Sequence, residues 1–297
     1  MINFIKKSYQ ALPFKKEVFS LLKKIWSPPE SIYRHLYFNG TIKIKVDEQH
    51  QFKIVHYGYQ IENELFWAGL VNGWEKHSMK LWTALSKESK VIFDIGSNTG
   101  VYTMVSKAVN PSASVHAFEP FESIYKKMVN NVNINSFDVN ANCLAVSNYT
   151  GDAVIYTEDP DFAYSVTVNQ NLWVKDKEPI EIKIKTITLK DYIEANNLTQ
   201  IDLMKIDVEM HEPEVMEGFA EYFEQFKPIL LIEILNEEIA LKLNRYFKPE
   251  DYHFYNIDES RGLTKTKFLS KSDFYNYLVV PIEKVEWWNR VSKIGYK

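Results

Sequence analysis

An acidic residue and a glycine-bearing loop follow one of the short apolar runs of this chain. Asp94 lies near the end of the run 91–95, and Gly96-Ser97-Asn98-Thr99-Gly100 comes directly after it. In a doubly wound sheet, the loop at the carboxyl end of the first strand binds nucleotide-like ligands. Gly96 and Gly100 allow backbone angles or close approaches that a side chain would block. Residues 96–100 are named here the glycine loop. Because Asp94 beside it would repel a pyrophosphate, this place suits a ligand that carries a positive amine.

A second acid stands at the end of the next apolar run, in Phe118-Glu119-Pro120. Glu119 follows Asp94 by 25 residues, which is the length of one strand–helix–strand unit. An acid in this position can accept hydrogen bonds from both hydroxyls of a ribose. A solvated loop acid is the ordinary alternative. The spacing from the glycine loop favours ligand binding.

The third chemical segment is Lys205-Ile206-Asp207-Val208-Glu209-Met210-His211-Glu212. Asp207 and Glu209 point the same way if the strand extends through both. With His211 they form a group of candidate acids and bases. The structural alternative is a helix N-terminus enriched in acids, which explains Asp207 poorly because a carboxylate that closes a buried strand needs a partner. The two acids could hold a divalent ion, but no further ligands have suitable spacing, so we predict no metal site.

Alternating strands and helices must position these three segments. From residue 91 onward, short apolar runs alternate with stretches of helical periodicity. We expect strands at 91–95, 114–118, 140–146, 153–157, 180–187, 201–208, 229–234, 253–257 and 277–280. One helix is expected to follow the first strand and to end near residue 109. Three more are expected at 122–135, 213–223 and 237–247. Apolar strands that alternate with helices indicate a parallel sheet covered on both faces.

The N-terminal residues differ in character. Residues 1–26 contain six lysines and one acid, and apolar residues recur at helical spacing at Phe14, Val18, Leu22, Ile25 and Trp26. Such a helix fits peripheral contact with an anionic membrane. It also fits packing on its own domain with the lysines in solvent, which is the commoner arrangement. A β-hairpin is expected over 41–55, followed by a helical pattern over 63–86 that breaks near Gly73.

Composition excludes several classes of protein. The chain has 297 residues, a net charge of −4 and 45% hydrophobic residues, as in ordinary globular proteins. This balance argues against nucleic acid as a partner, and the single Cys143 excludes a disulfide framework or a cysteine zinc ribbon. No apolar run is long enough to span a bilayer, and the first residues lack the apolar core of a secretory signal. We therefore expect a cytoplasmic protein, peripheral at the inner face of the membrane if residues 1–26 bind lipid.

The three chemical segments together resemble the FkbM-type family of S-adenosylmethionine-dependent methyltransferases. The stretch 94–100 is similar to the family's D-x-G-x-N-x-G, Phe118-Glu119-Pro120 to its F-E-P, and residues 205–209 to its K-I-D-V-E. Glu212 and Gly218 match as well, and the resemblance covers roughly residues 74–235. The family usually has glycine after D-V-E, whereas this chain has Met210, a bulkier residue that would reshape the acceptor side.

The resemblance implies an α/β fold of the class I methyltransferase type, a Rossmann-like doubly wound sheet of seven strands with only the last antiparallel. The methyltransferase domain would occupy residues 60–283, with an N-terminal helix-and-hairpin extension at 1–59 and a C-terminal tail at 284–297. The implied cofactor is S-adenosylmethionine. Its expected ligands are Glu75, Asp94, Gly96, Ser97, Asn98 and Gly100 at the methionine end, Glu119 with Pro120 at the ribose, and Ala145 at the adenine. The expected catalytic residues are His211, Glu209 and Asp207.

The reaction that the resemblance implies is O-methylation of a small-molecule or glycan acceptor, often a sugar in a polysaccharide or glycolipid. Two alternatives remain. One is an NAD-dependent oxidoreductase, which is disfavoured by Asp94 and because Asn98 stands where the G-x-G-x-x-G pattern requires its second glycine. The other is a non-catalytic membrane-surface protein on a nucleotide-binding scaffold. The sequence leaves the oligomeric state open.

Overall fold

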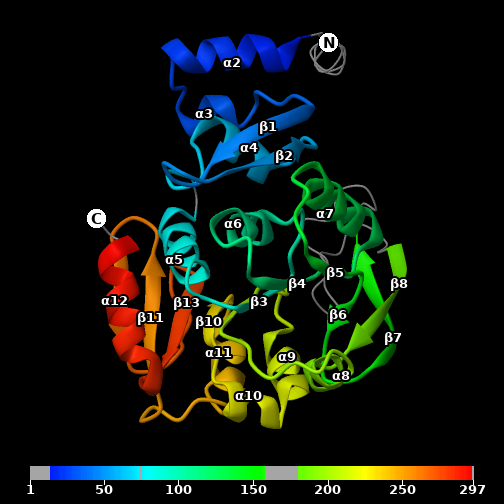
Figure 1. Ribbon diagram of the computed structural model, residues 1–297, viewed down its shortest axis with the longest axis vertical. Coiled ribbons are helices and arrows are strands. Elements are labelled where there is room, and N and C mark those ends of the chain that lie inside the picture. Colours follow the sequence, from blue (N-terminus) through cyan, green and yellow to red (C-terminus); the bar gives the residue numbers. More distant parts are fainter. Residues whose placement is uncertain (1–13, 74, 158–179, 296–297) are drawn as a thin grey trace. The chain divides into compact units, whose positions relative to one another are not determined.

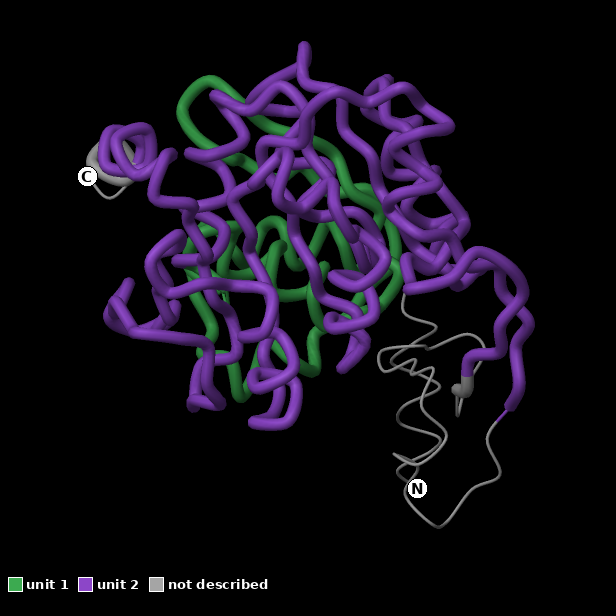
Figure 2. The backbone as a smooth tube through the Cα atoms, turned by 90° about the horizontal axis from the view of Figure 1, so that it is seen from below, with its two compact units in different colours: residues 1–76 green, residues 77–297 purple. Residues whose placement is uncertain are grey.

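The chain divides into two compact units, residues 1–76 and residues 77–297 (Figure 2). The computed structural model describes residues 14–73, 75–157 and 180–295. Helix α4 (Gln60–Trp67) packs on the hairpin that precedes it, so the boundary expected between residues 59 and 60 falls within unit 1. Lys6 and Lys7, which contribute to the basic N-terminal segment, lie outside the described residues.

Unit 1 is built on an antiparallel hairpin. Strand β1 (Gly40–Lys45) pairs with β2 (Gln51–His56), so that Ile42 lies opposite Ile54. Alternation puts the apolar side chains of both strands on one face, where Ile42, Ile44, Phe52 and Ile54 are buried. Helices α2 (Lys15–Ile25), α3 (Glu30–Tyr33) and α4 complete the unit (Figure 1). The predicted hairpin and the predicted N-terminal helix are both confirmed.

Unit 2 contains an eight-stranded sheet in the order β12-β11-β13-β10-β9-β3-β4-β5. Strands β3, β4, β5, β9 and β10 are mutually parallel, and β13 is antiparallel to β10. The resemblance implies seven strands, and this sheet has one more, β12, which runs antiparallel to β11 in a hairpin. It escapes prediction because an edge strand needs little apolar character. The bounds are β3 (Val91–Ile95), β4 (Ser114–Phe118), β5 (Asn140–Asn142), β9 (Leu203–Ile206), β10 (Ile229–Glu233), β11 (Tyr252–Asp258), β12 (Gly262–Thr266) and β13 (Asn276–Pro281).

The strand predicted over 140–146 is wrong as a single element. The chain leaves the large sheet after β5, and β6 (Ala145–Val146) joins a three-stranded sheet in the order β6-β8-β7. Strand β6 pairs with β8 (Ile180–Ile187), which also pairs with β7 (Gly151–Thr157). The change of sheet follows Asn142, whose side-chain amide donates to the carbonyl oxygens of Ala117 and Asn140 at 3.2 and 2.8 Å. These bonds fix the last residue of β5 at the edge of the large sheet.

Helices cover both faces of the large sheet (Figure 1). One face carries α5 (Lys76–Ser86), α6 (Val101–Val109) and α7 (Glu122–Ile134); the other carries α8 (Leu189–Ala195), α9 (Glu212–Phe219), α10 (Glu221–Phe226) and α11 (Glu237–Leu243). The helix predicted over 213–223 is two helices, because Ala220 has a left-handed φ of 49°. The expected tail begins at the last residue of a short 3₁₀ turn, η2 (Ile282–Lys284), and contains all of α12 (Val285–Gly295).

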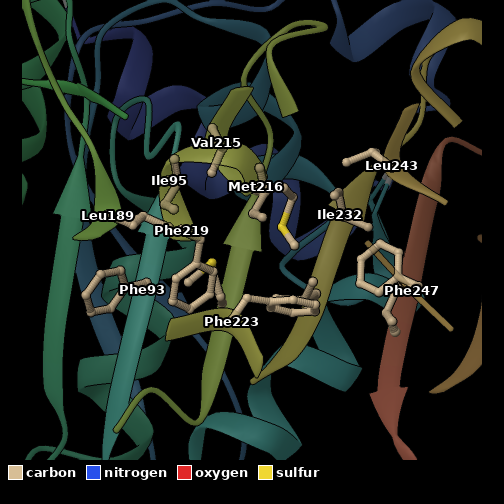
Figure 3. Packing of buried hydrophobic residues seen from close by; sticks show 14 of the residues in the cluster. Phe93, Ile95, Leu189, Val215, Met216, Phe219, Phe223, Ile232, Leu243 and Phe247 are labelled. Carbon is tan, nitrogen blue, oxygen red and sulfur yellow. The ribbon is translucent and has the colours of Figure 1, made fainter. Parts of the chain in front are cut away.

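The main core lies between the large sheet and α8–α11, as Figure 3 shows. Phe93 and Ile95 of β3 meet Val215, Met216 and Phe219 of α9 within one buried cluster. Close packing leaves little freedom for the strands. The strand ends, and the loops that leave them, therefore rest on a rigid platform. Within the described part of the chain, no helix is long and apolar enough to cross a membrane.

The strand order fixes where a ligand can bind. Strand β3 pairs with β4 on one side and with β9 on the other, all in parallel. The chain runs outward from β3 to β4 and β5, then crosses back to β9. Ligands of such sheets bind outside the carboxyl ends of the strands at this reversal. The loops after β3, β4 and β9 meet there.

Candidate functional site

The glycine loop is held by the end of β4. The backbone N–H groups of Gly96 and Ser97 donate to the carbonyl oxygen of Phe118 at 3.0 and 2.9 Å. The Ser97 hydroxyl donates to the carbonyl oxygen of Asp94 at 2.6 Å and accepts from the Phe118 N–H at 3.0 Å. These bonds satisfy the main chain of the turn from within. The glycine loop is thus shaped before any ligand arrives.

Both glycines are required by the packing of the loop. Gly96 and Gly100 have left-handed φ angles of 81° and 90°. A Cβ on Gly96 would lie 1.8 Å from the carbonyl oxygen of Asp207, and one on Gly100 would lie 2.9 Å from Cγ of Met128. The backbone contact at Gly96 joins the glycine loop to the loop after β9. The close approach predicted for these glycines is confirmed, and its partner is the protein itself.

Asp94 is fully buried, with one carboxylate oxygen used and one left over. The Thr103 hydroxyl donates to Oδ2 at 2.6 Å, whereas Oδ1 has no hydrogen-bond partner among the residues that the structure describes. Lys205 stands opposite Asp94 in the register of β3 and β9. Burial raises the pKa of Asp94, and the positive charge of Lys205 opposes that rise. The remaining oxygen is able to accept a hydrogen bond from a cationic donor.

Glu119 closes the other side of the glycine loop. Its Oε2 accepts from the Asn98 N–H at 3.0 Å, and its Oε1 accepts from the Phe121 N–H at 2.9 Å. Burial raises the pKa of Glu119 to about 7, although these two bonds favour the charged form. Each carboxylate oxygen has a second lone pair. The group can therefore bind the loop and accept from a pair of hydroxyls at the same time.

The other predicted cofactor ligands lie in three places. Pro120 follows Glu119, and its carbonyl oxygen accepts a weak hydrogen bond from the Cys143 thiol at 3.7 Å. Ala145 begins β6 and packs on a small cluster separate from the main core, formed by Phe121, Ile124, Ile155 and Ile184. Glu75 belongs to unit 1. A part for Glu75 at the methionine end of the cofactor stays a prediction.

Residues 207–212, named here the acidic loop, do not continue the strand. Strand β9 ends before Asp207, and Glu209 and Met210 have left-handed φ angles of 53° and 73°. The strand expected over 201–208 is therefore too long, and the condition for Asp207 and Glu209 to share one strand face is not met. The physical reason is Glu212, whose Oε1 accepts from the N–H groups of Val208 and Met210, both at 3.2 Å. These two bonds close the turn.

Asp207 has the partner that a carboxylate at a strand end needs. Its Oδ2 lies 2.6 Å from Nζ of Lys205, whose side chain is only 6% exposed. The same ammonium lies 4.7 Å from the ring centroid of Tyr102, a favourable cation–π contact. Lys205 thus acts on both Asp94 and Asp207. Sequence reasoning assigned it no role, although a lysine within a buried strand indicates a charge partner nearby.

Carboxyl groups with raised pKa values lie in the acidic loop and beside it. Burial raises the pKa of Glu209 to about 7, that of Glu212 to about 8 and that of Glu233 to about 9, and negative Asp207 contributes to each rise. Glu233 ends β10, one residue after Ile232, which lies opposite Ile206 of β9. Glu233 is absent from the predicted site. It is the one acid in the apolar run 229–234. An acid in an otherwise apolar strand was the signal in the sequence that could have identified it as a site residue.

His211 precedes α9 as its N-cap residue. Its Nε2 lies 3.0 Å from Oγ of Ser147, and its Nδ1 lies 3.6 Å from a carboxylate oxygen of Glu214. Burial lowers the pKa of His211, so the ring is neutral near pH 7. Because both ring nitrogens face neighbouring groups, the ring links the residue after β6 to the start of α9. In the described part of the chain, no group of three or more His, Cys, Asp or Glu residues is arranged to hold a metal ion.

The strand order, the glycine loop and the acid after the second parallel strand define a class I, Rossmann-like methyltransferase fold. A family model described as "Methyltransferase FkbM domain" matches residues 94–256, which is more than half of the chain. The chain belongs to the FkbM methyltransferase domain family. The match begins at Asp94 and includes the glycine loop, Glu119, the acidic loop and Glu233.

Curated relatives agree with this assignment. The chain is 27% identical over 146 residues to "Methyltransferase 1" of Beauveria bassiana, covering 44% of this chain and 59% of that protein. It is 26% identical over 144 residues to "Hexuronic acid methyltransferase AglP" of Haloferax volcanii, covering 48% and 56%. It is 26% identical over 152 residues to "31-O-demethyl-FK506 methyltransferase FkbM" of Streptomyces tacrolimicus, covering 43% and 58%. These matches span less than two thirds of each relative.

Solved structures show more distant likeness. The chain is 17% identical to a methyltransferase FkbM from Methylobacillus flagellatus KT, with a TM-score of 0.39, and the match covers 64% of this chain and 43% of that one. It is 11% identical to an O-methyltransferase from Bacillus cereus in complex with SAH, with a TM-score of 0.39 and coverage of 69% and 80%.

Proposed function

We propose that this chain transfers a methyl group from S-adenosylmethionine to a hydroxyl of an acceptor molecule. The observation that carries the proposal is the buried Oδ1 of Asp94, which has no hydrogen-bond partner among the described residues and lies beside the glycine loop at the reversal of strand order. A cationic amine would satisfy that oxygen. A dinucleotide would instead bring a pyrophosphate toward Asp94 and Asp207, which disfavours the oxidoreductase alternative.

The residues present fit this cofactor at both ends. The main chain of residues 96–100 and Asp94 would hold the methionine part, Glu119 with Pro120 the ribose, and Ala145 the adenine. When bound, the cofactor supplies a methyl group on a positive sulfur, which is ready for displacement by a nucleophile. The protein then has two further tasks, to align the acceptor oxygen and to take its proton.

Glu209 is our choice for the group that takes the proton. Its pKa of about 7 leaves close to half of its carboxyl groups ionised at neutral pH, and a base works best when its pKa is near the working pH. Asp207 is paired with Lys205, and both nitrogens of His211 face neighbouring groups. We therefore assign Asp207 and His211 to positioning.

Glu233 complements Glu209 in this proposal. With a pKa raised to about 9, it holds its proton at neutral pH. A protonated carboxyl group donates one hydrogen bond, and this bond would orient the acceptor oxygen without competing for its proton. Negative Glu209 is itself one cause of the raised pKa of Glu233. The two carboxyl groups therefore divide the roles of acceptor and donor between them.

The acceptor class is supported by the names of the relatives. One relative is named for a hexuronic acid and another for a 31-O-demethyl compound. A sugar hydroxyl in a polysaccharide or glycolipid is accordingly our proposed acceptor. Mass spectrometry of glycans from cells with and without this chain should reveal one methyl group that depends on it. An unchanged set of methylated sugars would count against a glycan acceptor while leaving cofactor binding unaffected.

Calorimetry tests the cofactor site directly. The full chain should bind S-adenosylmethionine and should not bind NAD. Asp94→Asn and Glu119→Gln should each weaken binding by about tenfold or more, since each removes a hydrogen bond made by a charged group. Glu122→Gln is the matched control, because Glu122 is exposed and paired with Lys126.

Two results would contradict this placement. Unchanged affinity in both Asp94→Asn and Glu119→Gln would move the site elsewhere, provided that circular dichroism shows both variants folded. Affinity for neither nucleotide would favour the non-catalytic scaffold, and affinity for NAD alone would favour the oxidoreductase.

A further inference from the structure

Helix α2 presents an apolar stripe to solvent. Phe14, at its N-cap, and Val18, Leu21 and Ile25 within it are 73%, 49%, 63% and 85% exposed. Their spacing of four, three and four residues places them along one side of the helix. Surface residues of this kind are ordinary when scattered, but a continuous row of large apolar side chains indicates an interaction site. These four residues are named here the apolar stripe.

The other side of α2 fixes the helix to unit 1. Phe19 is buried, and its ring centroid lies 6.0 Å from that of Phe38 and 5.5 Å from that of Trp67. The ammonium of Lys23 donates to the carbonyl oxygen of Phe66, and burial lowers the pKa of Lys23. Phe19 and Lys23 lie four residues apart, on the side opposite the apolar stripe. The helix is therefore held with its stripe outward.

This arrangement reverses the packing that the sequence favours. A helix packed on its own domain through its apolar face, with lysines in solvent, is the commoner case. Here the helix does pack on unit 1, but through Phe19 and the ammonium of Lys23, while Phe14, Val18, Ile25 and Trp26 of the predicted apolar face are exposed. Hydrophobic periodicity identifies which residues share a face. It does not identify which face meets the protein.

We propose that the apolar stripe docks on an anionic lipid surface. Helical geometry puts Lys15 on one flank of the stripe and Lys24, beside the single acid Glu17, on the other. Lys16 and Lys23 face away from the stripe. Apolar side chains in the acyl boundary with lysines at the headgroups are the pattern of an interfacial helix. Trp26, 42% exposed just after the helix, is a residue type that favours this boundary.

Charge favours lipid over a second copy of the chain. Two α2 helices that met through their stripes would bring the flanking lysines of one against those of the other, and like charges repel. An anionic bilayer instead attracts every one of them. The proposal is independent of methyl transfer, because it rests on unit 1 alone. It concerns where the chain binds rather than what it catalyses.

Co-sedimentation of the full chain with vesicles tests the proposal. Binding is expected to vesicles of phosphatidylcholine that contain one part in three of phosphatidylglycerol, and to be much weaker with phosphatidylcholine alone. The double variant L21E/I25E should lose at least about tenfold in affinity, since two side chains can no longer enter the apolar boundary. Leu241→Glu is the matched control, because Leu241 is 60% exposed on α11, outside the stripe.

A milder variant keeps the test informative if L21E/I25E folds poorly. Lys24→Gln should weaken binding to anionic vesicles by about fivefold, and raising the salt concentration should weaken it further. Calorimetry with S-adenosylmethionine on the same samples reports separately whether unit 2 is intact. Loss of cofactor binding would then be distinguished from loss of lipid binding.

Three results would overturn the proposal. The first is equal binding of L21E/I25E and the unaltered chain. The second is equal affinity for neutral and anionic vesicles. The third is an absence of vesicle binding. If sedimentation velocity then showed self-association that L21E/I25E abolishes, the stripe would be assigned to a second copy of the chain.

Discussion

The glycine loop and the acidic loop meet at one edge of the sheet, yet they are stabilised in opposite ways. The glycine loop is held by main-chain bonds to Phe118 and by the short side chain of Ser97. The acidic loop is held by ionisable side chains, with Glu212 closing its turn and Lys205 pairing with Asp207. The main-chain bonds do not depend on pH and leave a sequence motif, and Glu119 adds one ionisable contact to this loop through the Asn98 N–H. Side-chain contacts such as those of the acidic loop depend on protonation, and they are harder to recognise in a sequence.

Of the substitutions considered, Gly96→Ala should have the largest effect on the contact between the glycine loop and the acidic loop. The new Cβ would lie 1.8 Å from the carbonyl oxygen of Asp207, so the clash adds to the strain of a left-handed residue. We expect a loss of roughly 3 kcal/mol or more in the unfolding free energy of unit 2. Gly69→Ala, in unit 1, is the matched control. Gly69 has a φ of 85° and nothing within 4 Å of its Cβ position, so we expect a loss of about 1 kcal/mol.

Urea denaturation, followed by probes specific to each unit, measures both losses. Equal destabilisation by the two substitutions would mean that the glycine loop and the acidic loop are not joined by the contact at Gly96. The comparison between them would then concern two independent structures.

Glu209→Gln tests whether the acidic loop supplies the base. We expect turnover to fall by about 10² while cofactor affinity changes little, since general-base catalysis contributes on that order. Turnover of the unaltered chain should rise with a midpoint near pH 7, because Glu209 accepts a proton only when ionised. That midpoint should vanish in the variant. A midpoint that persists unchanged in Glu209→Gln would assign the titration to another group.

The stability of the ligand-free protein should fall as the pH rises from about 5 to 9. Folding raises the pKa of Glu212 to about 8 and that of Glu233 to about 9, above the ordinary value of about 4.3. In that window the folded state binds more protons than the unfolded state, so each further rise in pH favours unfolding. Shifts of this size imply a loss of several kcal/mol, which urea denaturation at several pH values measures.

Glu233→Gln should reduce the slope of this pH dependence throughout, most completely above about pH 8, where Glu212 has already lost its proton. The exposed Glu238→Gln, on α11, should leave the whole curve unchanged. Stability that increases with pH over this range would show that the carboxyl groups of the acidic loop are ionised and well paired in the folded state.

His211→Gln should have the smallest effect. Glutamine can still hydrogen-bond to Ser147, so turnover should fall only about twofold to fivefold, whereas His211→Ala loses the bond and should fall further. In both variants turnover should fall more than cofactor affinity, and the midpoint near pH 7 should remain. Steady-state kinetics over pH checks this. A lost midpoint in His211→Gln would make His211 the base.

The sequence predicts the strands and the turn of the glycine loop well, for a physical reason. Strands β3 and β4 are short apolar runs that periodicity identifies. The glycine loop needs glycine at positions 96 and 100, because glycine adopts left-handed φ angles without strain. The acidic loop escapes prediction because Glu209 and Met210 are residues that ordinarily avoid left-handed φ. Their turn is imposed by the carboxylate of Glu212, a contact that no local pattern encodes.

Strand pairing sets a similar limit in unit 2. Residues 140–146 are sufficiently apolar for one strand, yet β5 and β6 end in different sheets. A run of residues indicates that a strand will form but not which neighbour it will pair with. Glu233 illustrates the same limit. Its place in an apolar run can be read from the sequence, but its closeness to the acidic loop follows only from the pairing of β10 with β9.

The approach of Gly96 to the carbonyl oxygen of Asp207 leaves no room for a side chain between the two loops. Any residue larger than glycine at position 96 would have to displace the loop after β9 as well as its own. The two halves of the candidate site therefore cannot be altered separately at this position.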